Sequence, residues 1–275
     1  MRYLVLAIPL LCLGADRASD RAALLTADRT LSDRTAGLGM IRGFLPALTG
    51  GAAYLHPGAP LLRGIDRIRA FLESSDTLKP VTWSPVFADV SADGRLGYSY
   101  GFTRADGRRG KYLACWLKER AGWRIIAYAR TRAVPVTDSI APRRLPASVP
   151  VRGRPDSHEL IQADSQFAGL SVSQGAKAAF IAFAAQEAVS FGGGSQMNEG
   201  RAAVGAAFDA FPAGAVLAWW PVGAAIAESG DLGCTVGEAA IESLKQYSKY
   251  LTIWKRQRDG GWKFVADGGN PRPAP

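Results

Sequence analysis

A carboxylate near the end of the chain, Asp267, is the residue whose surroundings most directly suggest acid–base chemistry. In the last predicted strand, alternation places Asp267 on the same face as Lys263 and Val265 and opposite Phe264. If that face lines an apolar cavity, burial raises the pKa of the carboxyl group and makes Asp267 a candidate catalytic base. The alternative, which the following GGNP favours, is that Asp267 ends the strand and its side chain pins a turn.

Four residues of the first half are candidates for lining a ligand pocket. His56, in YLHPG, opens a loop, although a single histidine is more often a hydrogen-bonded loop residue than part of a site. Tyr54, Tyr98 and Tyr100 alternate with their neighbours and could line a cavity if their face points inward. We predict these four as ligand-binding residues.

The second half adds Glu187 and Trp220 as candidate ligand-binding residues. Glu187 precedes the short apolar stretch AVSF at 188–191, and Trp220 faces away from its neighbour, so that it could line a pocket or cover an interface. Asp28 and Asp164 occupy one position in two related halves, described below. Because their surroundings differ, a scaffolding role is the favoured interpretation for both.

Few residues could hold a metal or a cofactor. The chain has two histidines, His56 and His158, so we predict no histidine-based zinc site and no metal. The glycine-rich FGGGSQMNEG at 191–200 lacks the Gly-Lys-Ser/Thr ending of a phosphate-binding loop, and we predict no cofactor. The net charge of +9 is scattered rather than gathered in a stripe with stacking aromatics, so a nucleic-acid partner is not expected.

The elements that must position these residues occur twice, because the chain matches itself at a constant offset of 136 residues. The segment WSPVFADVSADGRLGYSYG (83–101) meets WWPVGAAIAESGDLGCTVG (219–237) with eight of nineteen positions identical. The closing segments at 112–131 and 250–269 also correspond, and there Tyr128 stands opposite Asp267. A period this long predicts two tandem domains rather than a solenoid. Their paired tryptophans are expected to be core residues.

Within each half, helical patterns come before strand patterns. In the second half, three-four spacing at 160–168, an alanine-rich run at 175–186 and a further run at 200–211 predict three helices. Alternating strands follow, and the last two are joined at Asp-Gly-Gly. This order predicts an α+β fold, with about three helices packed in a strongly curved antiparallel sheet in each of two cone-shaped domains.

The predicted domains are 19–132 and 158–275, joined by a proline-rich linker at 133–157. Residues 1–18 carry one basic residue, an apolar run too short to span a bilayer, and then small residues, which predicts a signal peptide removed after Ala15 or Ala18. The protein is therefore expected to be exported, without stable membrane insertion. Cys115 and Cys234 could form a disulfide there, but two buried free thiols are the favoured prediction.

The order of elements, the length of each unit and the ending YLTIWKRQRDGGWKFVAD resemble the nuclear transport factor 2-like superfamily, in the SnoaL-like branch related to ketosteroid isomerase. PGAPLLRGIDRIRAFL (57–72) is similar to the same branch, in which the loop that His56 opens often rims the pocket. The resemblance implies a cone-shaped barrel that is often dimeric through its sheet. The superfamily includes isomerases, cyclases, dehydratases and proteins without a known reaction, so the resemblance names a fold and no activity.

Three functions stay open from the sequence. The favoured one is an exported tandem protein that binds a small apolar or amphipathic molecule in a cone pocket. The second is a cofactor-independent isomerase, cyclase or dehydratase that uses a pocket carboxylate such as Asp267. The third is a structural or partner-binding module whose two sheets pack on each other as an intramolecular pseudo-dimer.

Overall fold

A computed structural model of the chain describes residues 17–74, 81–105, 108–131, 145–146, 149–151, 155–192 and 196–275. The predicted signal peptide, apart from its last two residues, and most of the predicted linker lie outside this described part. Within it the chain forms two α+β units with the same order of elements, so the predicted fold class and the two tandem copies are confirmed.

The first unit begins with a long helix and continues with a six-stranded mixed sheet. After the helix come a π-helical turn, Met40–Phe44, and a 3-10 turn, Leu45–Ala47. The sheet order is β2-β1-β6-β5-β4-β3, in which β1 and β6 are parallel and the other neighbours antiparallel. The helices and strands are α1 (Arg17–Gly39), β1 (Leu48–Leu55), β2 (Leu62–Arg63), α2 (Ile65–Ser74), β3 (Thr82–Val90), β4 (Leu96–Ala105), β5 (Arg108–Glu119) and β6 (Gly122–Arg130).

The second unit repeats this plan with a regular second helix. Its sheet order, β8-β7-β12-β11-β10-β9, is that of the first sheet strand for strand, again with one parallel pair, β7 and β12. The helices and strands are α3 (Ser157–Gln174), α4 (Ala176–Phe183), β7 (Ala184–Ser190), β8 (Asn198–Glu199), α5 (Arg201–Ala206), β9 (Ala218–Ile226), β10 (Leu232–Ile241), β11 (Gln246–Arg256) and β12 (Trp262–Pro271).

Each sheet bends at one duplicated bulge. The register of β3 with β4 skips Val86, and that of β9 with β10 skips Val222. The glycine opposite each bulge, Gly101 or Gly237, lets two backbones approach closely, because a Cβ atom on Gly101 would lie 2.0 Å from the carbonyl oxygen of Ser84. The bend lets each sheet curve around its helices.

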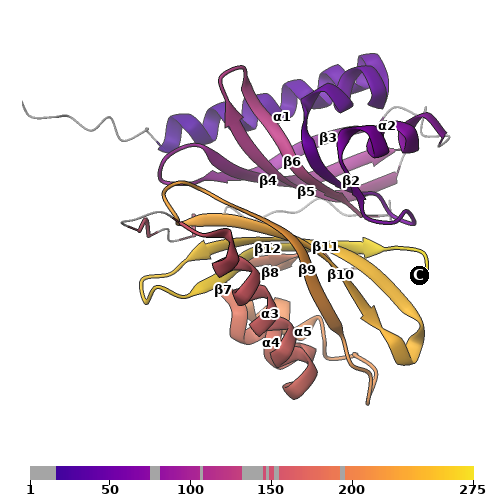
Figure 1. Cartoon of the computed structure of the whole chain (residues 1–275), viewed down its shortest axis with the longest axis vertical. Helices are drawn as coiled ribbons and strands as arrows, with labels where there is room; N and C mark the ends of the chain where they lie inside the picture. The colour runs from indigo at the N-terminus through magenta and orange to yellow at the C-terminus, as the bar shows by residue number, and fades with distance from the viewer. Residues whose placement is uncertain are drawn as a thin grey trace, which may run out of the picture.

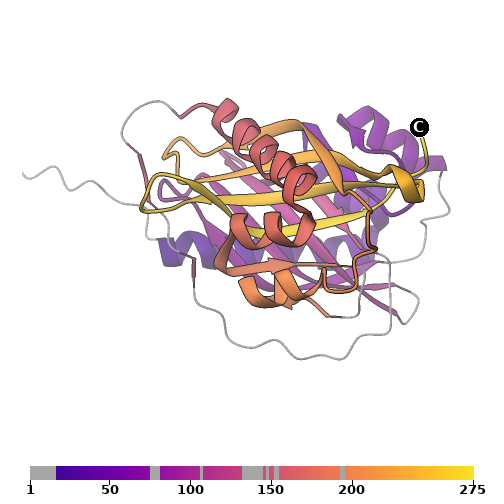
Figure 2. The ribbon, with the colours of Figure 1, turned by 90° about the horizontal axis from the view of Figure 1, so that it is seen from below.

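The two sheets face each other, and the helices cover the outer sides, α1 and α2 on one and α3, α4 and α5 on the other (Figure 1). Seen from below, the strands of the two sheets cross at an angle, as Figure 2 shows. Between the sheets the core is continuous, because buried residues of the first sheet, among them Tyr98, Tyr100 and Leu113, join the core cluster of the second unit.

Covalent and polar bonds also cross this interface. Cys115 on β5 and Cys234 on β10 form a disulfide with a Cα–Cα distance of 6.7 Å. The predicted pair of free thiols is therefore wrong, because the facing sides of the two sheets bring both side chains together. Lys255 of the second unit donates a 2.5 Å bond to Asp89 of the first, and neither side chain is exposed.

In the described part of the chain, no helix combines the length and the apolar character that crossing a bilayer requires.

Candidate functional site

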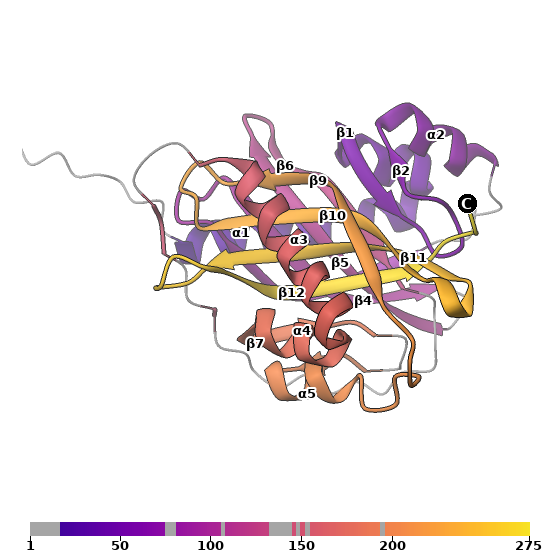
Figure 3. The same ribbon diagram turned by 60° about the horizontal axis from the view of Figure 1, so that its bottom comes forward.

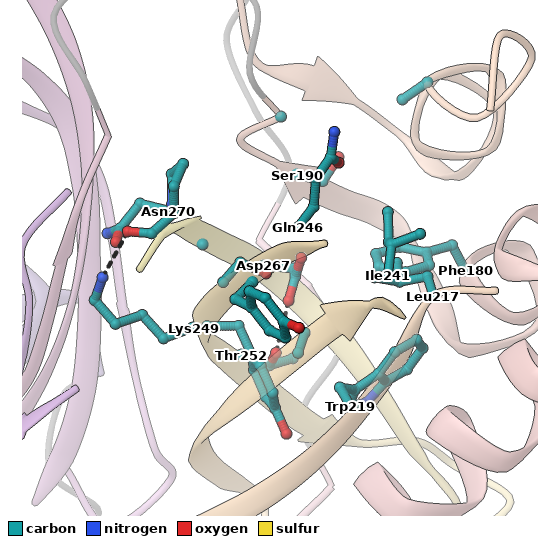
Figure 4. A pocket seen from close by; sticks show the side chains of 18 of the residues that line it. Phe180, Ser190, Leu217, Trp219, Ile241, Gln246, Lys249, Thr252, Asp267 and Asn270 are labelled. Carbon is teal, nitrogen blue, oxygen red and sulfur yellow. Dashed lines mark hydrogen bonds between the residues drawn. The ribbon is translucent and has the colours of Figure 1, made fainter. Parts of the chain in front are cut away.

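The second unit contains a cavity of about 860 Å³ between its helices and the concave face of its sheet. Its inner end is apolar and mostly aromatic, formed by Phe167, Phe180, Phe208, Leu217, Trp219 and Ile241. These side chains come from α3, α4, β9, β10 and the segments that follow α5 and precede β9. Figure 4 shows Phe180, Leu217, Trp219 and Ile241 grouped on one side of the cavity, and Figure 3 shows the helices that hold them beside the sheet.

A row of three polar residues crosses the middle of the cavity. Thr252 on β11 pairs with Asp267 on β12, which pairs with Ser190 on β7, so the three side chains lie side by side on the concave face. The hydroxyl group of Thr252 donates a 2.6 Å hydrogen bond to the carboxylate of Asp267. This row places the one acidic residue of the lining between the apolar end and the opposite, polar end (Figure 4).

Burial raises the pKa of Asp267 to about 7, because the surrounding protein withholds the water that would solvate the charged carboxylate. The hydrogen bond from Thr252 opposes this rise, and the nearby Asp164 adds to it. A carboxyl group with this pKa exchanges its proton near neutral pH, as a general acid or base must.

Asp267 lies within β12, which continues to Pro271, and the preferred interpretation that it ends a strand and pins a turn is wrong. Its predicted companions on the strand were also wrong in part. A bulge between the pairs Ile253–Ala266 and Trp254–Phe264 inserts one residue, so Phe264 shares the inner face with Asp267. A strict alternation cannot anticipate that extra residue.

Behind this row, Asp164 on α3 is held by two aromatic side chains. The indole N–H of Trp219 donates to Oδ1 at 2.9 Å, and the hydroxyl group of Tyr250 donates to Oδ2 at 3.0 Å. Burial raises the pKa of Asp164, although these bonds and one from Thr235 oppose the rise. Asp164 fixes two side chains of the cavity wall, which agrees with the scaffolding role favoured for it.

In the first unit, Asp28 makes the same pair of contacts. It accepts hydrogen bonds from Trp83 and Tyr112, both of 2.6 Å, and is fully buried. The row of three is different, however, because Ala114, Tyr128 and Tyr54 occupy the positions of Thr252, Asp267 and Ser190. Tyr128 stacks on both Tyr54 and Tyr112, with ring centroids 6.0 and 5.7 Å apart, and thus fills the interior.

The other end of the second cavity opens toward the first unit and is polar. Lys249, Asn270 and Arg272 line it, together with Thr131 of the first unit. The amide group of Asn270 donates to the backbone carbonyls of Leu55 and Arg130, both at 2.8 Å, and so ties this end of β12 to the first unit. The first unit therefore contributes one residue, Thr131, to the lining of the cavity.

Three of the predicted ligand-binding residues are buried in the first unit or between the sheets, outside this cavity. Tyr54 belongs to the aromatic filling of the first unit. Tyr98 and Tyr100 point into the interface, where Tyr100 contacts Phe191 edge-on at a centroid distance of 5.7 Å. Their predicted role in ligand binding stays a prediction.

The remaining candidates also lie elsewhere. His56 contacts Arg130 at 2.7 Å, and burial together with that positive charge lowers its pKa to about 4, so the ring is neutral at pH 7. Glu187 is half-buried on β7, and Trp220 is 42% exposed on the edge strand β9. None of the three lines the cavity.

Sequence reasoning missed Thr252, Ser190 and Tyr250, which surround Asp267. The internal repeat contained a signal for the first two, because it aligns Ser190 with Tyr54 and places Thr252 at the position of Ala114. A change from large or apolar to small and polar at neighbouring strand positions indicates an opened interior. Among the described residues, no group of three or more His, Cys, Asp or Glu side chains could hold a metal ion.

No family model matches the sequence. A comparison with curated proteins found no match either. Among solved structures, the chain is similar to an NTF2-like protein of unknown function from Pseudomonas putida, with 15% identity over 42% of this chain and 84% of that one and a TM-score of 0.35.

Two further structures show the same likeness. An NTF2-like protein of unknown function from Silicibacter pomeroyi has 17% identity over 42% of this chain and 99% of its own, with a TM-score of 0.34. A ketosteroid isomerase-like protein from Erwinia carotovora atroseptica has 12% identity over 40% and 92%, with a TM-score of 0.34. At these identities the likeness concerns the fold alone. Each of these structures matches about two fifths of the chain, and the two α+β units in tandem are shown by the chain's own two sheets.

Proposed function

We propose that the second unit binds a small amphipathic molecule in its cavity and that the first unit has become a filled support for it. One observation carries this proposal. In the second unit, which has the cavity, one row of three strand positions holds Thr252, Asp267 and Ser190. In the first unit, called the closed copy because aromatic rings fill its interior, the same row holds Ala114, Tyr128 and Tyr54. A cavity of about 860 Å³ lies in the range of small-molecule sites, which are mainly apolar with a few polar groups that orient the ligand.

The lining argues against a cavity that is merely poorly packed. An unfilled apolar gap costs stability without benefit, at about 24 cal/mol per Å³. Here the gap is bordered by Asp267 and Thr252 in hydrogen-bond contact. A buried carboxyl group at an open space is itself destabilising, and its presence is explained by a ligand that it contacts.

The experiment is to refill the second cavity with the residues of the first. Ser190→Tyr alone, or Asp267→Tyr with Thr252→Ala, places the aromatic rings of the closed copy into the open one. Native mass spectrometry of the protein purified from its own host is expected to show a bound small molecule in the wild type and none in these variants. A wild-type protein without bound mass, or a ligand that survives both refilled variants, contradicts the proposal.

A cofactor-independent proton-transfer enzyme is the second candidate, and the pKa of Asp267 favours it. With a pKa of about 7, the carboxylate could take a proton from a carbon or oxygen acid and return it elsewhere on the same ligand. Tyr250 lines the same cavity, and its hydroxyl group donates a 3.0 Å hydrogen bond to Asp164 behind the wall. Once a ligand is identified, turnover that disappears in D267N while the ligand still binds would favour the enzyme over the binding protein.

We further propose that the protein is exported. The support is the disulfide between Cys115 and Cys234, because disulfides persist mainly in oxidising compartments.

A third candidate, a structural module in which duplication supplies both halves of a dimer, has its support in the buried ion pair between Asp89 and Lys255. An empty cavity in host-purified protein, with the two units still joined, would favour this third candidate.

A further inference from the structure

The cavity of the second unit is asymmetric in charge as well as in polarity. Among the residues that line it, the basic ones are Lys245, Lys249 and Arg272, and the one acidic residue is Asp267. Figure 4 shows Lys249 and Asn270 on the side toward the first unit, Phe180 and Trp219 on the opposite side, and Asp267 between them. The distribution of charge along the cavity is therefore cationic at one end and apolar at the other.

Lys249 is the basic residue whose burial most needs explaining. Its side chain is fully buried, and its ammonium group donates a 2.9 Å hydrogen bond to the carbonyl of Pro271. In the described part of the chain no ion pair joins it to a carboxylate, whereas a buried ammonium group is normally paired. Burial, and next the charge of Arg272, lower the pKa of Lys249 to about 7, while Glu238 on the neighbouring strand opposes this shift. In its charged form the amino group has two donor positions left for a further acceptor, and an anion bound beside it would favour that form.

Arg272 is also incompletely satisfied. Its side chain is 10% exposed and lies 3.4 Å from Glu238, which is a long ion pair, and it donates to the carbonyl of Pro273 at 3.0 Å. Its Nε is buried and has no hydrogen-bond partner among the described residues. The guanidinium group therefore has a donor that no group among the described residues accepts.

Two acids near this end neutralise part of the positive charge. Glu238 is the partner of Arg272, and Glu242 accepts a 3.1 Å hydrogen bond from the hydroxyl group of Tyr247. Neither belongs to the lining of the cavity. What a ligand meets inside is Arg272, which is always charged, and Lys249, whose pKa burial and the charge of Arg272 lower to about 7.

We propose that the ligand of the second unit is an anionic amphipath, whose carboxylate, sulfate or phosphate group lies between Lys249 and Arg272 and whose apolar body packs against Phe167, Phe180 and Trp219. This inference rests on the proposed binding function and specifies the class of molecule. An acidic group at the cationic end would accept charge-assisted hydrogen bonds from both side chains. The apolar body would cover the aromatic end, and any hydroxyl or carbonyl group along it would meet Thr252 and Asp267.

The test uses two fluorescent probes that differ in one charged group. 8-Anilinonaphthalene-1-sulfonate carries a sulfonate, and N-phenyl-1-naphthylamine has the same ring system without it. The folded full chain is expected to bind the sulfonate probe about tenfold more tightly, which corresponds to about 1.4 kcal/mol. In R272Q and in K249M this preference is expected to fall to about twofold or less, while the affinity for the neutral probe stays unchanged.

Matched controls separate the possible results. Arg69→Gln removes an exposed arginine of α2 in the first unit and is expected to leave both affinities unchanged, which excludes a general effect of net charge. Because K249M could fail to fold, thermal unfolding of each variant is followed, and R272Q alone suffices as a test. Ser190→Tyr fills the cavity and is expected to abolish binding of both probes.

The outcomes distinguish this inference from the function on which it rests. Suppose that both probes bind with equal affinity, that Ser190→Tyr abolishes their binding and that R272Q leaves both affinities unchanged. The cavity then binds a neutral amphipath, and the anionic inference is wrong. If neither probe binds the folded protein, or Ser190→Tyr leaves binding intact, the proposed binding function itself is wrong.

Discussion

Thr252 and Asp267 face each other across β11 and β12, and the threonine hydroxyl donates a 2.6 Å hydrogen bond to the carboxylate. That bond favours the ionised acid, but burial outweighs it and raises the pKa of Asp267 to about 7. The charge of the cavity therefore changes as the pH passes through about 7, so this residue pair couples the stability of the fold to pH.

Replacing Asp267 by Asn is expected to stabilise the protein above pH 7 and to change its stability little near pH 4. Because the pKa of Asp267 in the folded state is about 7 and that of an unfolded aspartate about 3.9, the folded state binds the extra proton between these values. The stability due to the protonated acid is therefore present below pH 4 and lost as the pH rises through 7, by at most about 4 kcal/mol. Urea unfolding of wild type and D267N at pH 4, 6 and 8 measures the difference.

Asp93 is the matched control, because its pKa is shifted in the opposite direction and its contribution to stability therefore changes with pH in the opposite sense. Burial alone would raise the pKa of Asp93, but hydrogen bonds from Ser91, Arg95 and Ser229 outweigh it and lower the pKa. Asp93 therefore stabilises the protein above pH 4 and ceases to do so as the pH falls, so D93N should lose stability at pH 8. Stability curves of D267N and wild type that run parallel from pH 4 to 8 would refute the assigned pKa shift.

Alanine substitutions at the two matched positions should have unequal costs. Tyr128 is 2% exposed and contacts several aromatic rings, so Tyr128→Ala leaves a hole and is expected to cost about 3–5 kcal/mol. Asp267 borders an open cavity and its truncation leaves little new empty space, so Asp267→Ala should cost about 1 kcal/mol or less. The two free energies of unfolding are compared at pH 4, where the carboxyl group of Asp267 is protonated and its ionisation does not contribute. Equal losses would mean that the second interior is packed as tightly as the first.

Replacing Asp28 or Asp164 should lower the free energy of unfolding by similar amounts but should affect probe binding differently. Asp28→Ala leaves Trp83 and Tyr112 without their acceptor, and Asp164→Ala does the same to Trp219 and Tyr250. Each substitution is expected to cost about 2–4 kcal/mol, because two buried donors lose their partner. Only Asp164→Ala should weaken binding of the fluorescent probes, because Trp219 and Tyr250 line the cavity. Probe binding that falls equally in both variants would point to general loosening.

Much of the fold could be predicted from the repeat, because features that persist in both copies are those that the fold itself requires. The pairs Asp28–Trp83 and Asp164–Trp219 are joined by hydrogen bonds in their own units, and each spans the same 55 residues. The tandem copies and the burial of most of the paired tryptophans followed from such pairs, although Trp123 is half-buried. The α+β class followed from the order of helices before strands. The curvature is likewise duplicated, through Gly101 and Gly237.

The site was less predictable, because it depends on local irregularity and on contacts between the units. A single bulge in β12 shifts Phe264 to the face of Asp267, which no alternation rule includes. Which face of β4 turns inward was equally undetermined, and Tyr98 and Tyr100 turned out to face the other sheet. The partnership of Cys115 with Cys234 depends on how the two sheets pack, which neither unit encodes alone.

Reduction of the disulfide should destabilise the native state without unfolding either unit's core. Cys115 and Cys234 are separated by 119 residues, so in the chain-entropy view the bond contributes at most about 5 kcal/mol. Urea unfolding with and without a reducing agent should show a shifted midpoint. A variant with Cys115→Ala and Cys234→Ala should match the reduced protein and no longer respond to the agent; a response that persists in this variant would show that another bond is responsible.

Arg17, the first described residue of α1, bears on where a signal peptide would be cut. Its guanidinium group donates to both carboxylate oxygens of the buried Asp89, each at 2.8 Å, beside the ammonium group of Lys255. Cleavage after Ala18 would remove Arg17 and leave Asp89 with one cation, whereas cleavage after Ala15 keeps both. We therefore expect the exported protein to begin at Asp16.

The intact mass of protein recovered from the exported fraction measures this site directly, and a chain that begins at Ser19 or keeps residues 1–15 would contradict it. The energetic reason is tested separately with Arg17→Gln. Because the side chain of Arg17 is 32% exposed, this substitution should cost only about 1 kcal/mol. Arg69→Gln, which removes an exposed arginine of α2, should cost nothing measurable. Equal stabilities of the two variants would mean that Lys255 alone satisfies Asp89, and the fold would then give no preference between the two cleavage sites.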